Sequence, residues 1–199
     1  MNDANPVGTP MECGVKITKQ DGEEKVNSIY FKSLVGSLRY LTCTRPDILY
    51  SIRIISRFME ESTATHCKMA KRIFFYIKRT IGYGLSYVSS SNFDIVGYCD
   101  SDWSSDLDDQ KSTTGFVFFI GETTFTWMSK KQPIITLSTC EAEYVVTTSY
   151  VCHAIWLRNL VKELKFQMEG PMEIFVDNKS AIALAKNPVF HGRSKHIDT

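Results

Sequence analysis

Three acidic residues lie where a sheet and a helix can bring carboxylates together. Asp100 ends a short apolar run, Glu143 lies early in a long amphipathic stretch, and Asp177 ends a second apolar run at residues 174–176. Two carboxylates at neighbouring strand ends, with a third on a helix packed across them, would form an oxygen-only site. Such a site suits Mg²⁺ or Mn²⁺ better than zinc or copper. If the three converge, the expected chemistry is two-metal hydrolysis of a phosphodiester.

The first part of the chain has a helical pattern. Residues 1–26 are polar and punctuated by glycine and proline, which is typical of a tail or linker. Between residues 27 and 84, apolar residues recur at helical spacing in three runs, which predicts three helices. Thr44 and Pro46 are expected to begin the second helix, and Gly82 and Gly84 to end the third. The third run has a basic side, which is typical of a solvated face or, alternatively, of contact with a nucleic-acid backbone.

From about residue 85 the apolar period shortens. Four β-branched and aromatic runs are separated by Ser, Asn, Asp and Gly, which predicts an antiparallel meander. The runs are residues 85–88, 95–99, 115–120 and 123–128. Gly121 and Glu122 are expected to form the tight turn between the last two runs. The acidic group Asp106, Asp108 and Asp109 lacks the glycine and the closing glutamate of an EF-hand, so a solvated turn is expected there.

The last part of the chain alternates helix and strand. The run Ser138-Thr139-Cys140-Glu141 matches a capping box, and apolar residues then recur at helical spacing as far as Leu164. Residues 172–176 are predicted as a strand and residues 178–186 as a short helix. The order of strands, long helix, strand and helix implies a mixed sheet with a helix laid across it. The predicted fold class is therefore α/β, with a helical N-terminal annex.

Composition excludes several classes of protein. With 43% hydrophobic and 12% aromatic residues among 199, the chain can bury a substantial core. A net charge of +1 means that any nucleic-acid partner would be held by local patches. The six cysteines include no C-x-x-C pair, which indicates free, mostly buried thiols in a reducing, intracellular setting, either cytoplasm or nucleus. No signal-peptide pattern or membrane-length apolar run is present, so secretion and membrane insertion are disfavoured.

Several long runs resemble the C-terminal part of copia-type retrotransposon Pol polyproteins, where the end of the reverse transcriptase joins the ribonuclease H domain. The runs are YFKSLVGSLRYLTCTRPDILYSI, CDSDW, DDQKSTTGFVFFIG, TWMSKKQPIITLSTCEAEY, WLRNLVKEL and DNKSAIALAKNPVFHGRSKHID. They occur in the family's order from about residue 6 onward. The resemblance implies a helical, thumb-like region at residues 27–84 and a ribonuclease H-like mixed sheet with a long helix across it at residues 85–199.

The resemblance also implies the site residues. The first acid lies in YCDSDW, where Asp100 is aligned in preference to Asp102, and the second lies in STCEAEY, where Glu143 is preferred to Glu141. The third is Asp177 of the strand-end DN. Helical geometry separates the two glutamates only weakly, because Glu141 also serves the predicted cap. The implied cofactor is Mg²⁺ or Mn²⁺.

The implied activity is hydrolysis of the RNA strand of an RNA/DNA hybrid. Asn178 and Ser180 are candidates for contact with the 2′-hydroxyl, which distinguishes RNA from DNA. Lys130 and Lys131 are candidates for phosphate binding, although a loop with two lysines is more often solvated. The remainder of the reverse transcriptase would be a partner if the chain is expressed within a polyprotein.

Two departures from the family reduce the expected activity. The family's fourth acid lies beyond the KHID run, and Asp198 is not its obvious equivalent. The final strand and helix of the fold are also missing, so we expect weak metal binding and little or no turnover. The reverse-transcriptase catalytic motif, a paired aspartate after an aromatic residue, is missing too, which excludes polymerase activity on this chain. The alternative is a non-catalytic, co-opted copia remnant that acts as an interaction or effector-like protein; a hybrid-binding module without turnover is a weaker third possibility.

Overall fold

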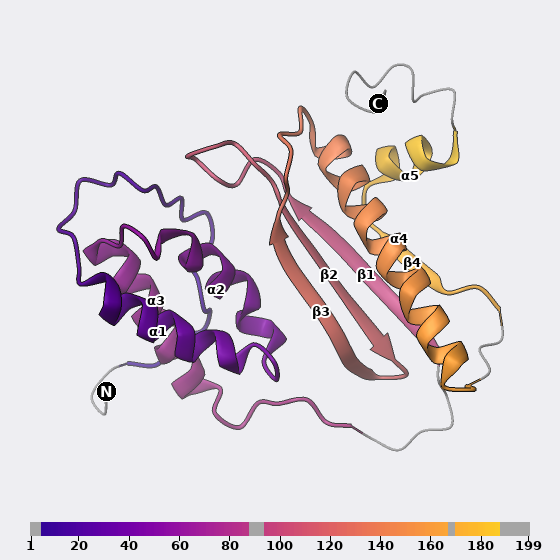
Figure 1. The fold of residues 1–199 in the computed structure, drawn as a ribbon, viewed down its shortest axis with the longest axis horizontal. Coiled ribbons are helices and arrows are strands. Elements are labelled where there is room, and N and C mark those ends of the chain that lie inside the picture. The colour runs from indigo at the N-terminus through magenta and orange to yellow at the C-terminus, as the bar shows by residue number, and fades with distance from the viewer. Residues whose placement is uncertain (1–4, 88–93, 167–169, 188–199) are drawn as a thin grey trace. The chain divides into compact units, whose positions relative to one another are not determined.

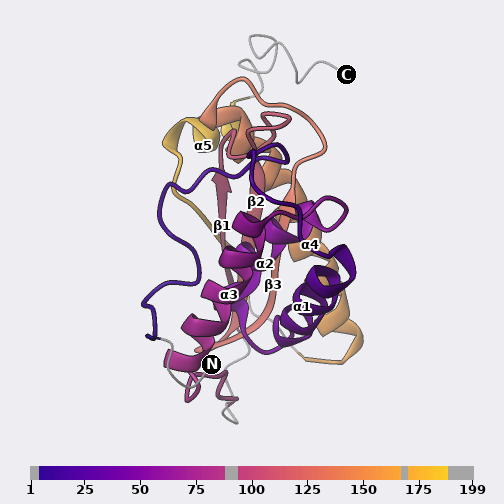
Figure 2. The ribbon, with the colours of Figure 1, turned by 90° about the vertical axis from the view of Figure 1, so that its left-hand side faces the viewer.

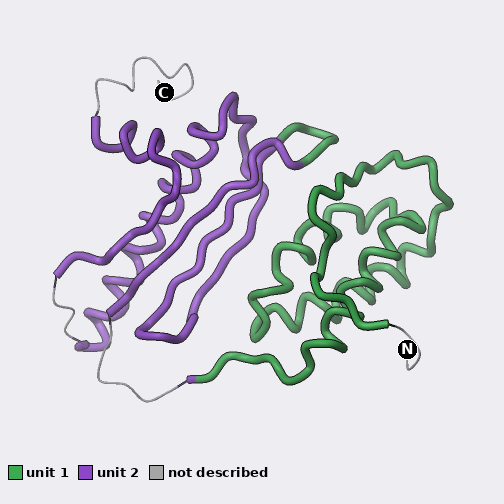
Figure 3. Tube along the Cα trace, turned by 180° about the vertical axis from the view of Figure 1, so that it is seen from behind, with its two compact units in different colours: residues 1–86, 106–110 green, residues 87–105, 111–199 purple. Residues whose placement is uncertain are grey.

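A computed structural model describes residues 5–87, 94–166 and 170–187. The chain divides into two compact units, coloured separately in Figure 3. Unit 1 comprises Met1–Ser86 together with Asp106–Gln110, and unit 2 comprises Tyr87–Ser105 and Lys111–Thr199. Each unit has a hydrophobic core of its own.

Unit 1 is built from the three predicted helices, which Figures 1 and 2 show as α1, α2 and α3. They span Ser28–Leu41, Leu49–Ile55 and Ala64–Arg79, with short 3₁₀ turns at Pro46–Ile48 and Ser56–Phe58. Apolar residues at helical spacing meet in one core, as the periodicity predicts. The buried members are Phe31, Val35, Leu38, Ile48, Ile52, Ile55, Cys67, Ala70 and Ile73.

The predicted helix ends in unit 1 are wrong in two places. The Thr44 hydroxyl does not cap the second helix, because it donates to the carbonyl of Leu41 at the end of α1. The helix α3 stops before the glycines at 82 and 84. The backbone N–H of Thr80 is bonded to the carbonyl of Tyr76 at 3.0 Å, so the last turn closes without a left-handed residue.

The N-terminal stretch of unit 1, predicted as a tail or linker, lacks helices and regular strands over the described residues 5–26 but contacts α3 and the turn before it. Ile17 is buried, and the N–H of Val26 donates to the carbonyl of Ser62 at 2.9 Å. The ring of His66, buried in α3, accepts a hydrogen bond at Nδ1 from the N–H of Thr63 and lies 3.2 Å from the Thr18 carbonyl through Nε2. The stretch is therefore fixed by both apolar and polar contacts.

Unit 2 contains the predicted mixed sheet, with strand order β3-β2-β1-β4. The strands are β1 (Ile95–Asp102), β2 (Thr113–Ile120), β3 (Thr123–Lys131) and β4 (Glu173–Val176). The first three form the expected antiparallel meander, and β4 pairs with β1 in parallel. Gly121, in the predicted two-residue turn, has a φ of 57°, a conformation that glycine adopts without steric cost. The fold is therefore the predicted α/β class.

One predicted strand is not formed. Residues 85–87 have no regular secondary structure, and Val88 lies outside the described residues. Both neighbouring positions beside β1 are occupied by β2 and β4, and the Tyr87 side chain is exposed. A short apolar run without a partner strand has no ladder to join.

Two helices complete unit 2: α4 (Thr139–Glu163), which packs along the sheet, and α5 (Lys179–Lys186), which contacts α4 (Figure 1). The core between α4 and the sheet consists of Ile95, Cys99, Phe116, Phe118, Val146, Tyr150, Ala154 and Leu157. Gly97 permits the closest approach, because a Cβ at this position would overlap the Tyr150 hydroxyl.

Two further expectations concern the whole chain. All six cysteines are free thiols, as the spacing predicts, but only Cys67 and Cys99 among them are buried, so the expectation of mostly buried thiols is wrong. Over residues 5–87, 94–166 and 170–187, no helix combines the length and the apolar content needed to cross a membrane.

Candidate metal site

The structure brings the three predicted acids together. Asp100, Glu143 and Asp177 each offer a carboxylate oxygen, and these oxygens all lie within 4.8 Å of one another. Asp100 and Asp177 are exposed, whereas Glu143 is buried. Carboxylates this close repel one another unless a proton or a cation lies among them.

Strand register positions the two aspartates. The parallel ladder between β1 and β4 pairs Cys99 with Val176, and Asp100 and Asp177 are the next residues of the two strands. Because parallel strands run in the same direction, residues that follow a paired position leave the ladder at the same edge. The two carboxylates are therefore adjacent, although they are 77 positions apart in the sequence.

The N-terminal end of α4 positions the third acid. Ser138 caps this helix, and its hydroxyl accepts the N–H of Glu141 at 3.2 Å, which is one of the two hydrogen bonds of the predicted capping box. The Glu141 carboxylate accepts the N–H of Leu137 at 2.6 Å and is half-buried, so it serves the helix start. Glu143, which is only 5% exposed, is the glutamate that joins the two aspartates.

One backbone N–H connects two of the carboxylates. The N–H of Ser101 donates to Asp100 Oδ1 at 2.7 Å and to Glu143 Oε1 at 2.8 Å. The second oxygen of Glu143, Oε2, is buried and has no hydrogen-bond partner. Burial raises the pKa of Glu143 to about 7; the Ser101 hydrogen bond opposes this rise, and the charges of Asp100 and Asp177 add to it.

This arrangement fits a divalent cation. A buried carboxylate oxygen without a partner is costly, and here it lies beside two further carboxylates. A cation would satisfy that oxygen and remove the repulsion among the three groups. Three carboxylate oxygens with no nitrogen or sulfur ligand match the preference of Mg²⁺ and Mn²⁺.

The thiol beside the site does not take part in this arrangement. Cys99 is 7% exposed and belongs to the core of unit 2, as expected for a packing residue. Burial, followed by the negative charge of Glu143, raises the pKa of the Cys99 thiol to about 11. A thiol with such a pKa stays neutral near pH 7 and is a poor nucleophile.

The predicted substrate-binding residues lie at other element ends. Asn178 caps α5, and its Oδ1 accepts the N–H groups of Ser180 and Ala181, both at 3.0 Å. Ser180 is exposed in the first turn of α5, and Lys130 and Lys131 end β3. None of these residues belongs to the three-carboxylate cluster. Asp198 lies outside the described residues, as does the basic stretch before it, whose charge suits contact with a phosphate backbone; the stretch contains His191, Arg193, Lys195 and His196.

A residue that the sequence did not single out lies behind the acids. Gln132 follows β3, is 3% exposed, and contacts the chain next to two of the carboxylates, at Ser101 and at Ala142. Its only sequence signal is an uncharged amide directly after two lysines at a strand end. That signal is too weak to predict contacts across three elements.

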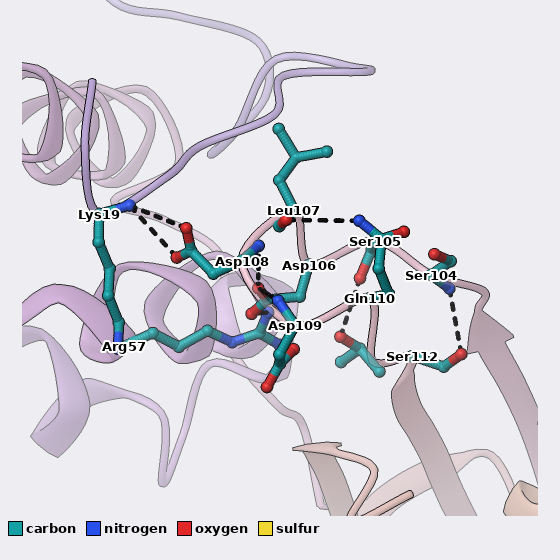
Figure 4. Close-up of polar contacts among 11 residues, drawn as sticks. Lys19, Arg57, Ser104, Ser105, Asp106, Leu107, Asp108, Asp109, Gln110 and Ser112 are labelled. Atoms are coloured by element: carbon teal, nitrogen blue, oxygen red, sulfur yellow. Dashed lines mark hydrogen bonds and ion pairs between the residues drawn. The ribbon is translucent and has the colours of Figure 1, made fainter. Parts of the chain in front are cut away.

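The acidic group at residues 106–109, predicted as a solvated turn, is partly buried in unit 1. Figure 4 shows it next to Arg57, which forms an ion pair with Asp106 at 2.8 Å. Asp106 is 6% exposed, and its Oδ1 accepts the N–H of Asp108 at 2.9 Å. The backbone N–H of Lys19 donates to the Asp108 carboxylate at 3.2 and 3.3 Å. The solvated-turn prediction is thus wrong for Asp106, because the sequence does not indicate that Arg57 lies opposite it.

Known proteins similar to this chain include Pol polyproteins of transposons. The chain is 36% identical to the retrovirus-related Pol polyprotein from transposon RE2 of Arabidopsis thaliana, over 98% of this chain and 13% of that protein. It is 38% identical to the corresponding protein from transposon TNT 1-94 of Nicotiana tabacum, over 100% of this chain and 15% of that protein. It is also 33% identical to secreted RxLR effector protein 161 of Plasmopara viticola, over 66% of this chain and 94% of that protein.

The similarity to the polyproteins covers a small part of them. The chain spans 13% and 15% of the length of the two described above. No family model and no solved structure matches the chain.

Proposed function

Because the chain belongs to the copia-type retrotransposon Pol polyprotein family, we propose that unit 2 is a ribonuclease H-like nuclease that cleaves the RNA strand of RNA/DNA hybrids. The observation that carries this proposal is the group of three carboxylates from β1, α4 and the end of β4, within 4.8 Å of one another. Surface carboxylates are common, but three from separate elements with one of them buried form a ligand set.

The three acids would hold Mg²⁺ or Mn²⁺. When bound, such an ion supplies positive charge for the phosphodiester and lowers the pKa of water. Glu143 would contribute the buried Oε2, which has no hydrogen-bond partner, while the Ser101 N–H holds Oε1 at 2.8 Å. Asp100 and Asp177 are exposed and would contribute the side of the site that faces substrate.

Substrate contacts would come from the surrounding strand and helix ends. Asn178 uses its Oδ1 to cap α5, so its amide Nδ2 would be the group that donates to a 2′-hydroxyl. Ser180 would offer its hydroxyl from the first turn of the same helix. Lys130 and Lys131 would bind phosphates as point charges. The remaining Pol polyprotein is the proposed partner, since the similar proteins are polyproteins.

The test is cleavage of a labelled RNA/DNA hybrid by the full chain with Mg²⁺ or Mn²⁺. Asp100→Asn should abolish cleavage, because it removes a carboxylate of the cluster. Asp102→Asn is the matched control: this residue lies two positions along the same strand and outside the cluster, so cleavage should persist. Absence of metal-dependent cleavage by the wild-type chain, or equal cleavage by wild type and Asp100→Asn, would reject the proposal.

A second candidate function is a non-catalytic interaction protein. This candidate is favoured by the similarity to the secreted effector, because the region shared with this chain makes up 94% of that protein. The two candidates differ in one measurement: an interaction protein should show no dependence of hybrid cleavage on Asp100. The convergence of the three acids favours the nuclease.

A further inference from the structure

The amide of Gln132 links three elements of unit 2. Its backbone N–H donates to the carbonyl of Ser112, just before β2, at 2.8 Å. Its side-chain Nε2 lies 3.0 Å from the carbonyl of Ala142 in α4, 3.2 Å from Thr114 Oγ1 in β2 and 3.4 Å from Ser101 Oγ in β1. One side chain therefore connects the end of β3 with β1, β2 and the start of α4.

The chemistry of these partners fixes the orientation of the amide. A backbone carbonyl only accepts hydrogen bonds, so the Gln132 atom beside Ala142 must be the nitrogen. The other end, Oε1, is buried without a hydrogen-bond partner. Burying an unsatisfied oxygen destabilises a fold. The position thus holds a side chain that core packing alone would not favour.

The partners of Gln132 are the immediate neighbours of two site acids. Ala142 precedes Glu143, and Ser101 follows Asp100. The N–H of Ser101 in turn bonds both carboxylates. A shift of the Ala142 carbonyl relative to Ser101 would therefore change the separation of the two acids.

Ala142 is fully buried at this end of α4 but is not a member of the core cluster of unit 2. The first α4 residue in the buried core cluster of unit 2 is Val146, which lies one turn beyond Ala142. Polar contacts also join the start of the helix to β1. They include the Ser101–Glu143 hydrogen bond and the contacts of the Gln132 amide.

We propose that Gln132 is the positioning residue of the three-carboxylate site: it holds the Ala142 carbonyl and the Ser101 hydroxyl on one amide and so sets the separation of the Asp100 and Glu143 carboxylates. The role of a bound metal in this inference rests on the proposed function. The hydrogen bonds of Gln132 do not depend on it. It assigns Gln132 no contact with substrate or with reacting atoms. Partners that orient metal ligands commonly change metal affinity by about 10- to 100-fold when they are removed.

The test uses Gln132→Met in the full chain, because methionine has a similar length but cannot donate a hydrogen bond. Gln132→Leu serves as a second variant if the first does not fold. Ser129→Ala is the matched control: this residue is also a buried polar group of β3, and its hydroxyl has no hydrogen-bond partner. Folding of each variant is checked by tryptophan fluorescence.

Two readouts separate the inference from the proposed function. The first needs no metal: amide hydrogen exchange at Ser101 should accelerate at least about tenfold in Gln132→Met, while the central β1–β2 amides keep their protection. The second is Mn²⁺ affinity by titration calorimetry, which should weaken about tenfold in the same variant and stay unchanged in Ser129→Ala. In a Glu143→Gln background the Gln132 substitution should add less than a twofold further loss, because the two residues act as a unit.

Each outcome has one meaning. Unchanged Ser101 exchange in a folded Gln132 variant overturns the positioning role, even if the wild type binds Mn²⁺. Faster Ser101 exchange with no Mn²⁺ binding by the wild type supports the geometry and overturns the proposed metal function. Equal losses of Mn²⁺ affinity in Gln132→Met and Ser129→Ala would indicate a general effect of core substitution and would overturn the specific role.

Discussion

Replacing Glu143 with glutamine should stabilise metal-free unit 2 above neutral pH. The folded-state pKa of Glu143 is about 7, against 4.5 for an ordinary glutamate, chiefly because the side chain is buried. The difference corresponds to at most about 3 kcal/mol, since one pKa unit is worth about 1 kcal/mol or slightly more. A raised folded-state pKa means that this contribution is fully present below pH 4.5 and is lost as the pH rises through 7.

Glutamine has nearly the same shape and retains an oxygen that can accept the Ser101 N–H. It carries no charge, so the repulsion from Asp100 and Asp177 disappears. The wild-type unfolding free energy should therefore fall by about 2 to 3 kcal/mol between pH 5 and pH 8. The variant should lose little over this range and should be the more stable protein at pH 8.

Urea unfolding in the presence of a chelator, followed by tryptophan fluorescence, measures this difference. All three tryptophans, Trp103, Trp127 and Trp156, lie in unit 2, so the signal reports that unit alone. Glu163→Gln is the control, because this residue lies in the last turn of α4 and is exposed. A wild-type stability that is flat or rising from pH 5 to pH 8, or a Glu143→Gln variant less stable than wild type at pH 8, would refute the reasoning.

Three further outcomes are expected. Gly97→Ala should destabilise unit 2 by about 1 to 3 kcal/mol in the same urea assay, because the added methyl group overlaps the Tyr150 hydroxyl; a neutral effect would contradict the packing described. Addition of Mg²⁺ at ten times its dissociation constant should stabilise unit 2 by about 1.4 kcal/mol, and Asp100→Asn should abolish this gain. Unit 1 should lose stability as the pH falls through about 6.5, because burial lowers the pKa of His66 in the folded state and the unfolded chain then binds the proton more readily. Hydrogen exchange at the Thr63 amide, which donates to His66, would show this loss, and pH-independent protection would argue against it.

Local patterns predicted the elements of the fold well. The spacing of Phe31, Val35 and Leu38 determines which face of α1 is buried, and the glycine at 121 fits the turn between two alternating strands. These features depend on residues close together in the sequence, which is why a single chain reveals them. The mixed sheet followed from the order of the elements.

Contacts between distant segments were harder to predict. Three contacts depend on which atoms lie opposite a side chain in the folded chain. They are the hydrogen bond of the Thr44 hydroxyl to α1, the ion pair of Arg57 with Asp106 and the hydrogen bonds of the Gln132 amide. Spacing alone could not exclude either Glu141 or Glu143 as the second acid of the site. In the structure, Glu141 bonds the N–H of Leu137, and this contact separates the two glutamates.

Connectivity limits how this protein can be dissected. The polypeptide passes between the two units three times, because residues 106–110 belong to unit 1 while the flanking residues belong to unit 2. A fragment beginning at residue 87 would carry the buried Asp106 carboxylate without the guanidinium of Arg57, and the complementary fragment would have lost that acid. Co-expression of the two pieces, or grafting a shorter turn in place of residues 106–110, is therefore the sounder route to an isolated unit 2.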